Sequence, residues 1–443
     1  MPQVVSVPSL VPQIAVSSVP RLILAGDSRM QDTIGTSTPP SYTRSGLSVG
    51  SAILWRMKGR VIHNPTADLF AQNSVTTAQW ISAKLASCVA RCLQVSQPIV
   101  LMHLATNDPR TSVAIGTTKA NIQTIVAALN AAGARVLWLL EHPCSGGFAF
   151  GGSNNQVKNQ LNAWLIDLAN SGTYKLMTVN YLDEFLDAST GLVISGYQRD
   201  GLHDAQIGAE VKANAVERAL NVLVPKSVMM PFIDSTDVFD SSANPMGNKL
   251  TNGLLAGTGG TVTSPATGTS PTSWTLAVRN AANSGAGSTL TAAGANVSHA
   301  SGLGGIDDYA ITGLTGLKVT LGGTAGSGEF VRLTQSPSVT NYSAGDVIRM
   351  RAWVNWTGVS NIASIYLNTV VNSPTVTIID GIQGSSGGNV PAAGTRMFEV
   401  YVTLPASLTG TFVFELRIVA ATNTSAVAGE VTWWRPEIRK LVA

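Results

Sequence analysis

The sequence predicts an α/β domain with a mostly parallel sheet in three α/β/α layers, followed by an all-β, jelly-roll-like sandwich. From Arg21 to about Val224, short aliphatic runs alternate with amphipathic stretches, whereas polar and apolar residues alternate at period two beyond residue 251. The chain of 443 residues is also longer than one hydrophobic core usually supports. We therefore expect an extended arm at 1–20, the α/β domain at 21–225, a linker at 226–250 and the sandwich at 251–443.

Five aliphatic runs are the expected strands of the parallel sheet. Strands covered on both faces by helices should be almost wholly apolar, as most of these runs are. The expected strands are RLILAG at 21–26, RVIHN at 60–64, PIVLMHLA at 98–105, RVLWLLEH at 135–142 and YKLMTVNY at 174–181. The expected helices cover 76–94, 117–133, 154–172 and 205–223.

The second half shows no helical periodicity. Its clearest strands are DVIRMRAWVNW at 346–356, RMFEVYVTLP at 396–405 and GTFVFELRIVA at 410–420, separated by clusters of Gly, Asn, Pro and Ser. The alternation is typical of antiparallel sheets packed face to face.

Composition excludes several classes of function. Charged residues make up 12% of the chain and the net charge is +3, so nothing indicates a nucleic-acid partner. Three cysteines with no zinc-type spacing predict no metal, and we expect no cofactor. No apolar run is long enough to cross a membrane, and the first twenty residues lack the basic start of a signal peptide.

Polar residues follow the expected strands at the carboxyl edge of the sheet, where open α/β sheets place their chemistry. Gly26, Asp27 and Ser28 come after the first strand. Asn107 and Asp108 come after a middle strand, and Asp200 and His203 precede the last helix.

These residue types suit acyl transfer. A serine hydroxyl needs an imidazole to take its proton, and the imidazole needs a carboxylate to hold its tautomer. Ser28, His203 and Asp200 can take these roles. The Ser28 backbone N–H and the Asn107 amide are candidate donors to the oxyanion, with a third donor expected after the second strand.

Each motif also has a purely structural explanation. Asp27 or Ser28 can cap a helix, Asn107 and Asp108 can form an Asx turn, and Asp200 and His203 can cap the last helix. His103 and His142 lie in apolar strands and are expected in the core. The strings GLSVG at 46–50 and GSSGG at 384–388 match a nucleophile elbow, but neither follows a clear strand and opens a helix.

Residues 20–224 resemble the SGNH or GDSL-type hydrolases. The family's Gly-Asp-Ser, Gly-x-Asn-Asp and Asp-x-x-His blocks read here as Gly26-Asp27-Ser28, Ala105-Thr106-Asn107-Asp108 and Asp200-Gly201-Leu202-His203. Ala105 replaces a glycine of the family. AQNSVTTAQW, at 71–80, is similar to the family's second block with Ser74 at the position of its loop glycine, which implies that the Ser74 N–H is an oxyanion donor.

The resemblance implies ester hydrolysis, often the removal of O-acetyl groups from polysaccharides. The glycine- and threonine-rich second half resembles modules of bacteriophage tail proteins, which implies an extracellular or virion-associated esterase acting on bacterial surface glycan. Its partners would be acetylated polysaccharide and other tail proteins, and a homo-oligomer is left open. The alternatives are a lipase or thioesterase on longer acyl chains, and a non-catalytic tail adhesin.

Four tryptophans of the second half are candidates for stacking on sugar rings. Trp353 and Trp356 should face opposite sides of their strand, and so should the adjacent Trp433 and Trp434. At least one member of each pair is therefore expected in the core, and the others could form a carbohydrate-binding platform.

Overall fold

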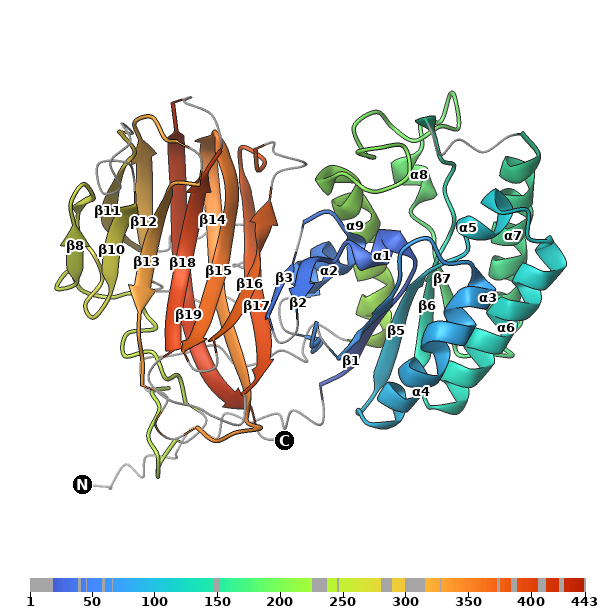
Figure 1. The fold of residues 1–443 in the computed structure, drawn as a ribbon, viewed down its shortest axis with the longest axis horizontal. Helices are drawn as coiled ribbons and strands as arrows, with labels where there is room; N and C mark the ends of the chain where they lie inside the picture. Colours follow the sequence, from blue (N-terminus) through green and yellow to red (C-terminus); the bar gives the residue numbers. More distant parts are fainter. Residues whose placement is uncertain are drawn as a thin grey trace, which may run out of the picture.

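The computed structural model contains a helix-covered parallel sheet and a β-sandwich that lie side by side (Figure 1). It describes residues 19–441 apart from several short segments. Those outside the description are 1–18, 39–40, 45, 58–59, 66, 147–151, 225–236, 245–246, 280–288, 299–314, 327, 339, 341, 373–374, 384–388, 405–411, 422–425 and 442–443. The expected arm except Val19 and Pro20, part of the expected linker and the GSSGG string fall on these residues.

The first sheet is parallel throughout, in the order β4-β1-β5-β6-β7. Four of the five predicted strands are present: β1 has the predicted bounds, and the other three are shorter than predicted. The strands are β1 (Arg21–Gly26), β4 (Leu69–Ala71), β5 (Pro98–His103), β6 (Arg135–Leu139) and β7 (Leu176–Val179).

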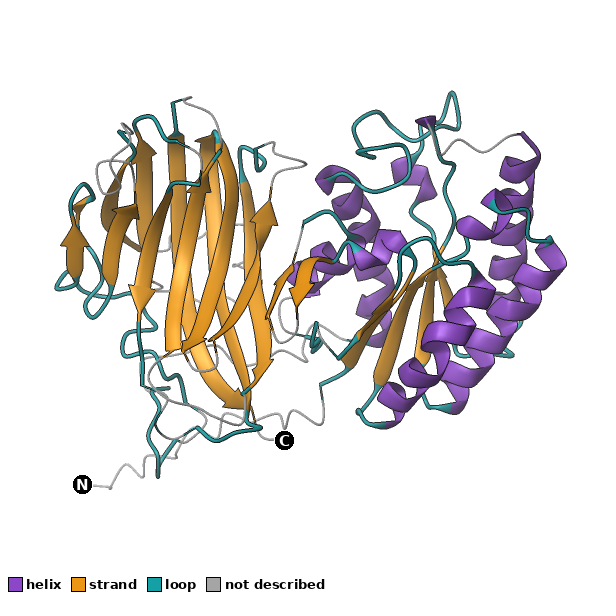
Figure 2. Cartoon of the chain, in the orientation of Figure 1, coloured by secondary structure: helices purple, strands orange, loops and turns teal. Residues whose placement is uncertain are grey.

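Helices cover both faces of this sheet, as Figure 2 shows. Alternate residues of β1 point to opposite layers: Leu22 and Leu24 pack with α2, α8 and α9, while Ile23 and Ala25 pack with the helices of the other face. The three-layer α/β/α prediction is therefore confirmed. The helices are α1 (Ser28–Gln31), α2 (Val49–Met57), α3 (Thr77–Trp80), a π-helix (Ile81–Leu85), α4 (Ala86–Leu93), α5 (Asn107–Arg110), α6 (Ile115–Ala131), α7 (Gly152–Asn170), α8 (Leu182–Phe185) and α9 (Gln206–Leu223).

The second expected strand was wrong. Residues 60–64 contribute only an isolated bridge between Ile62 and Arg21, and β4 occupies the edge of the sheet beside β1 instead. Val61 and Ile62 suggested a strand, but the next two residues make hydrogen bonds outside a ladder: the His63 imidazole to the Leu22 carbonyl, and the Asn64 backbone N–H to the Asp68 carboxylate.

The second half forms two mostly antiparallel sheets that pack as a sandwich. Their inward side chains, among them Ile348, Leu416 and Trp433, make one hydrophobic cluster. The eight-stranded sheet is β2 (Ile34–Thr38), β3 (Ser41–Arg44), β16 (Thr375–Gln383), β15 (Ile362–Asn372), β18 (Phe412–Ala420), β13 (Phe330–Gln335), β10 (Thr275–Arg279) and β8 (Thr261–Thr263). The six-stranded sheet is β17 (Gly394–Thr403), β14 (Val347–Ser360), β19 (Ala428–Leu441), β12 (Thr315–Gly322), β11 (Thr291–Ser298) and β9 (Thr267–Gly268).

Two elements of the first half belong to the sandwich as well. The β2–β3 hairpin follows α1, and β3 pairs in parallel with β16, which extends the eight-stranded sheet. From α2, the buried Trp55 side chain joins the sandwich core and packs edge-on against Phe398 of β17. Its indole N–H donates to Asp380 Oδ1 at 3.1 Å, while Asp380 Oδ2 accepts the backbone N–H of Glu399. Neither element was predicted from the sequence.

Candidate active site

The turn that carries Ser28 requires glycine at its start. Gly26 has φ +147°, and a Cβ on it would lie 2.1 Å from the carbonyl oxygen of His103 on the neighbouring strand. Asp27 then caps α1, because its carboxylate accepts the Arg29 backbone N–H. Ser28 is therefore the first residue of α1, at the carboxyl edge of the sheet.

His203 joins the serine to an aspartate. Its Nε2 lies 2.8 Å from Ser28 Oγ, and its Nδ1 lies 2.6 Å from Asp200 Oδ2. A carboxylate can only accept, so Nδ1 carries the proton and Nε2 can accept the serine proton. The sequence placed these residues 175 positions apart, and the structure brings them into one hydrogen-bonded chain.

The Asp200 carboxylate is held by the backbone as well as by the imidazole. Its Oδ1 accepts the N–H groups of Leu202 and His203 at 3.0 and 2.8 Å. Partial burial would raise the pKa of Asp200, but these bonds and the imidazole contact outweigh it and hold the pKa below its usual range. Asp200 is therefore ionised while it orients His203.

The loop of Asp200 is anchored on both sides. Gly201 has φ +89°, and a Cβ there would lie 2.3 Å from the Ser145 carbonyl oxygen. On the other side, Arg199 pairs with Asp32, which directly follows α1, at 2.5 Å.

Asn107 lies where an oxyanion donor is expected, beyond β5 and next to β1. It is almost fully buried, its Nδ2 donates to the Val75 carbonyl at 2.9 Å, and its Oδ1 accepts from Arg110 Nη1 at 3.2 Å. The Val75 contact ties Asn107 to the loop that contains Ser74.

The two departures from the family pattern have the backbone shape that glycine favours. Ser74 has φ +59° and Ala105 has φ +115°. Both positions thus have a backbone conformation that glycine adopts more readily, and at Ala105 it is strained because the residue has a Cβ.

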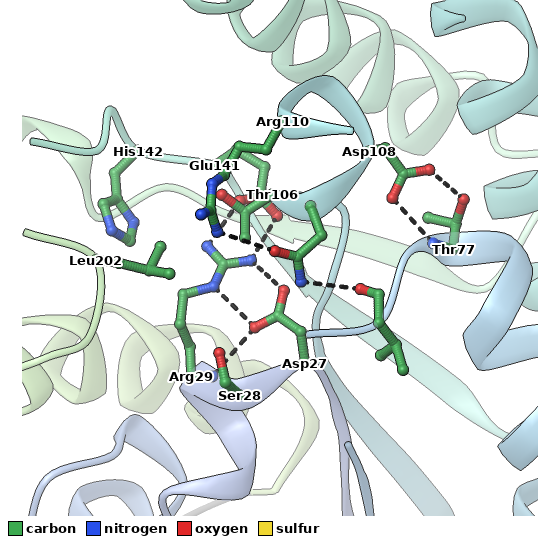
Figure 3. Close-up of polar contacts among 12 residues, drawn as sticks. Asp27, Ser28, Arg29, Thr77, Thr106, Asp108, Arg110, Glu141, His142 and Leu202 are labelled. Carbon is green, nitrogen blue, oxygen red and sulfur yellow. Dashed lines mark hydrogen bonds and ion pairs between the residues drawn. The ribbon is translucent and has the colours of Figure 1, made fainter. Parts of the chain in front are cut away.

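Asp108 is a support rather than a reacting group. It is fully buried, and it accepts from the Thr77 hydroxyl, the Thr77 backbone N–H and the Thr118 hydroxyl at 2.5, 2.9 and 3.1 Å. These bonds fix the start of α3 against α5, as Figure 3 shows for Thr77.

A buried ion network that was not predicted from the sequence lies beside Ser28 (Figure 3). Arg29 is 1% exposed, donates twice to Asp27 at 2.9 and 2.7 Å, and donates to Glu141 at 2.7 and 3.1 Å. Burial alone would lower the pKa of Arg29, but the two carboxylates raise it well above its usual value. The sequence contains one indication of this network, because Glu141 is a charged residue near the end of the mostly apolar run 135–142.

His103 and His142 are fully buried, which confirms the core prediction. Burial and the nearby cations Arg29 and Lys212 lower the pKa of both far below the usual value. His142 pairs with the Tyr181 hydroxyl at 2.7 Å.

The sugar-stacking prediction for the four tryptophans is wrong. Trp353, Trp356, Trp433 and Trp434 are each at most 2% exposed. Alternation did place them on opposite faces, since Trp356 and Trp433 join the sandwich core and the other two do not. The outward face is covered too, so neither Trp353 nor Trp434 presents a ring to solvent.

The GLSVG string comes soon after β3, which ends at Arg44, and Val49 opens α2, so both parts of its expectation were wrong. Ser48 is nevertheless fully buried, and its hydroxyl lies 2.8 Å from that of Thr33. It is a packing residue and not an exposed nucleophile.

Within the described residues, no group of three or more His, Cys, Asp or Glu side chains could hold a metal ion. Nor does any helix in the described ranges have the length and apolarity to span a membrane.

Comparisons with known proteins find similar structures but no similar sequences. No protein-family model and no curated protein matches the chain. Among solved structures, it is similar to a GDSL-like lipase from Bacteroides thetaiotaomicron, with 16% identity, 46% of this chain and 88% of the lipase covered, and a TM-score of 0.36.

Two further structures are similar over the same share of the chain. A member of the lipolytic G-D-S-L family from Veillonella parvula is 11% identical, with 46% of this chain and 98% of that protein covered and a TM-score of 0.35. TesA is 19% identical, with 46% and 99% covered and a TM-score of 0.33. The first two neighbours are described as a lipase and as a member of a lipolytic family, at low identity and over about half of this chain.

Proposed function

We propose that this chain is a serine ester hydrolase that removes O-acetyl or similar short acyl groups from a polysaccharide. The observation that carries the proposal is the continuous hydrogen-bonded chain from Ser28 Oγ through His203 to Asp200. That arrangement supplies a nucleophile, a base and an orienting carboxylate.

In the proposed reaction, Ser28 Oγ attacks the ester carbonyl carbon while His203 Nε2 takes the hydroxyl proton. The imidazolium that forms is stabilised by Asp200. As the tetrahedral intermediate collapses, His203 returns the proton to the sugar oxygen, which leaves as an alcohol. Water then attacks the acyl-serine with His203 again acting as base, and the carboxylic acid is released.

The oxyanion would be bound by the Ser28 N–H, the Ser74 N–H and Asn107 Nδ2. The loop geometry supports this set, because Asn107 is bonded to the residue after Ser74. Removing one such donor typically costs about 2.7–4 kcal/mol of transition-state stabilisation.

The first test is hydrolysis of p-nitrophenyl acetate, butyrate and octanoate by the purified protein, by Ser28→Ala and by Ser87→Ala. Ser87 is an exposed serine on α4 and serves as the matched control. Acetate hydrolysis that is lost only in Ser28→Ala supports the proposal. Equal rates in all three proteins would contradict it and favour the non-catalytic adhesin.

A preference for octanoate would favour the lipase or thioesterase alternative. Two exposed aliphatic side chains lie on either side of the Asp200–His203 segment in sequence: Leu192, 56% exposed, and Ile207, 54% exposed. They are candidates for contact with a longer acyl chain.

The polysaccharide part of the proposal rests on the resemblance and on the attached sandwich, and the buried tryptophans give it no further support. Acetate release from O-acetylated bacterial surface glycans, measured with wild type and Ser28→Ala, tests it directly. A glycan substrate would place the protein outside a bacterial cell, either free or on a virion.

A further inference from the structure

We propose that Arg110 is a positioning residue that fixes the Asn107 amide for binding the oxyanion. This inference rests on the proposed hydrolase function and adds a residue to its machinery. Arg110 follows Asn107 by three positions in the one-turn helix α5, and its Nη1 donates to Asn107 Oδ1 at 3.2 Å.

The orientation of the Asn107 amide decides whether it helps or opposes the reaction. A flip by half a turn would exchange its nitrogen for its oxygen, and an oxygen facing the oxyanion would repel it. The Val75 carbonyl accepts only from a nitrogen, and the Arg110 guanidinium donates only to an oxygen. Only one orientation satisfies both contacts.

The two contacts leave one Asn107 hydrogen for the substrate. Nδ2 has two hydrogens, and its single hydrogen-bond acceptor among the described residues is Val75 O. Oδ1 is engaged by Arg110. The second hydrogen is therefore available to a developing oxyanion on the sheet edge that holds Ser28.

The charge of Arg110 adds to this effect. Asn107 is 5% exposed, so the contact lies where electrostatic interactions are stronger than in water. A cation on Oδ1 polarises the amide and makes its N–H groups better donors to the negative intermediate. Figure 3 shows the Arg110 side chain above the same strand ends as Asp27 and Ser28.

Hydrogen bonds hold helix α5 in place, which preserves the contact between Arg110 and Asn107. The Thr111 backbone N–H and hydroxyl both donate to the Asn107 carbonyl, at 3.0 and 2.8 Å. Asp108, between Asn107 and Arg110, is anchored by the two threonines described above. The backbone of α5 is thus fixed from both sides, and the remaining freedom is in the Asn107 side chain.

The test is a double-mutant cycle with Arg110→Ala, Asn107→Ala and the double variant, measured as kcat and KM on p-nitrophenyl acetate. We expect Arg110→Ala to lower kcat by about 10- to 100-fold with little change in KM, the range for losing a hydrogen bond to a charged group. In the Asn107→Ala background the same substitution should have no further effect, because the group that it positions is gone.

A matched control and a chemical rescue make the test specific. Arg135→Ala removes an exposed arginine at the start of β6, at the opposite edge of the sheet, and should leave kcat unchanged. Guanidinium ion at millimolar concentration should restore part of the kcat of Arg110→Ala and none of that of Asn107→Ala. If Arg110→Ala does not fold, as judged by its thermal melt, Arg110→Gln takes its place in the cycle.

Three results would overturn the inference: an unchanged kcat in the Arg110 variant, an effect on KM alone, or an equal loss in the Asn107→Ala background. The first would show that the contact is dispensable, the second that Arg110 binds substrate directly, and the third that it acts independently of Asn107. If wild type does not exceed Ser28→Ala, it is the proposed function that fails.

Discussion

His203 and Asp200 contact each other twice: the imidazole Nδ1 lies 2.6 Å from Oδ2, and the His203 backbone N–H donates to Oδ1 at 2.8 Å. The same carboxylate thus holds both the ring and the backbone of the histidine. It fixes the tautomer in which Nδ1 carries the proton and Nε2 can accept a hydrogen bond from the Ser28 hydroxyl.

Asp200→Asn should lower kcat sharply. The amide can present an N–H to Nδ1 and so favour the wrong tautomer, and the loss in a comparable triad is about 10⁴-fold in kcat. Steady-state hydrolysis of the acetate ester measures it. Asp167→Asn, at an exposed position of α7, is the control. A rate within twofold of wild type would rule out Asp200 as the orienting carboxylate.

Ala105→Gly should stabilise the protein by about 1 kcal/mol. Ala105 has φ +115°, and a strained backbone of this kind costs about 1–3 kcal/mol, which exceeds the entropy that glycine adds to the unfolded chain. Urea unfolding measures the change. Ala127→Gly, in the middle of α6, is the matched substitution and should destabilise by about 1 kcal/mol. A loss of stability in both variants would show that Ala105 is not strained.

Glu437→Gln should destabilise the sandwich by about 3–5 kcal/mol at neutral pH. Glu437 is fully buried among Arg349, Arg351 and Arg439, at 2.6, 2.5 and 2.8 Å. Burial would raise the pKa of Glu437, but the three arginines outweigh it and lower the pKa from 4.5 to about 2.

The sign of the pH dependence follows from that lowered pKa. The stabilisation from Glu437 is fully present above pH 4.5 and is lost as the pH falls toward about 2. The difference in urea midpoint between wild type and Glu437→Gln should therefore shrink over this range. Glu184→Gln, which breaks a surface pair with Arg218, should change little at any pH. A difference that stays constant between pH 4.5 and pH 2 would contradict the assignment.

Trp55→Ala should destabilise both halves of the chain together, by about 3–5 kcal/mol. The helix α2 packs on the first sheet, while Trp55 itself is part of the sandwich core. Calorimetry of Trp55→Ala should show a single unfolding transition, shifted to lower temperature, and not two transitions of which one has been lost. Trp164→Ala on α7, whose half-buried indole packs against the α/β core, is the comparison. Two separate transitions in wild type would contradict this coupling.

Local pattern was enough to predict the helix-covered sheet and the residues that meet at its edge. Ser28, Asn107, Asp200 and His203 could be proposed because parallel strands bring their ends together, which topology alone determines. Arg29, Glu141 and Arg110 could not be proposed in the same way. Their importance lies in pairings such as Arg29 with Glu141, 112 positions apart, which no periodicity reveals.

The sugar-stacking prediction for the tryptophans was wrong, and the β2–β3 hairpin was not predicted, for a related reason. Alternation tells which side of a strand Trp353 faces, but not whether another segment covers that side. The β2–β3 hairpin consists of short polar strands whose partner, β16, comes much later in the sequence. Such a pairing has no local signal.

The position of that hairpin also determines the order in which the sandwich can be completed during synthesis. Trp55 and its partner Asp380 are separated by 325 residues, and β3 pairs with the strand that contains Asp380. The α/β half therefore emerges from the ribosome with a hairpin and an indole that have no partner until almost the whole chain has been made. Contacts of such long sequence separation form slowly. The unpaired edge of the β2–β3 hairpin and the apolar Trp55 indole therefore stay exposed on the ribosome-bound chain until late in synthesis.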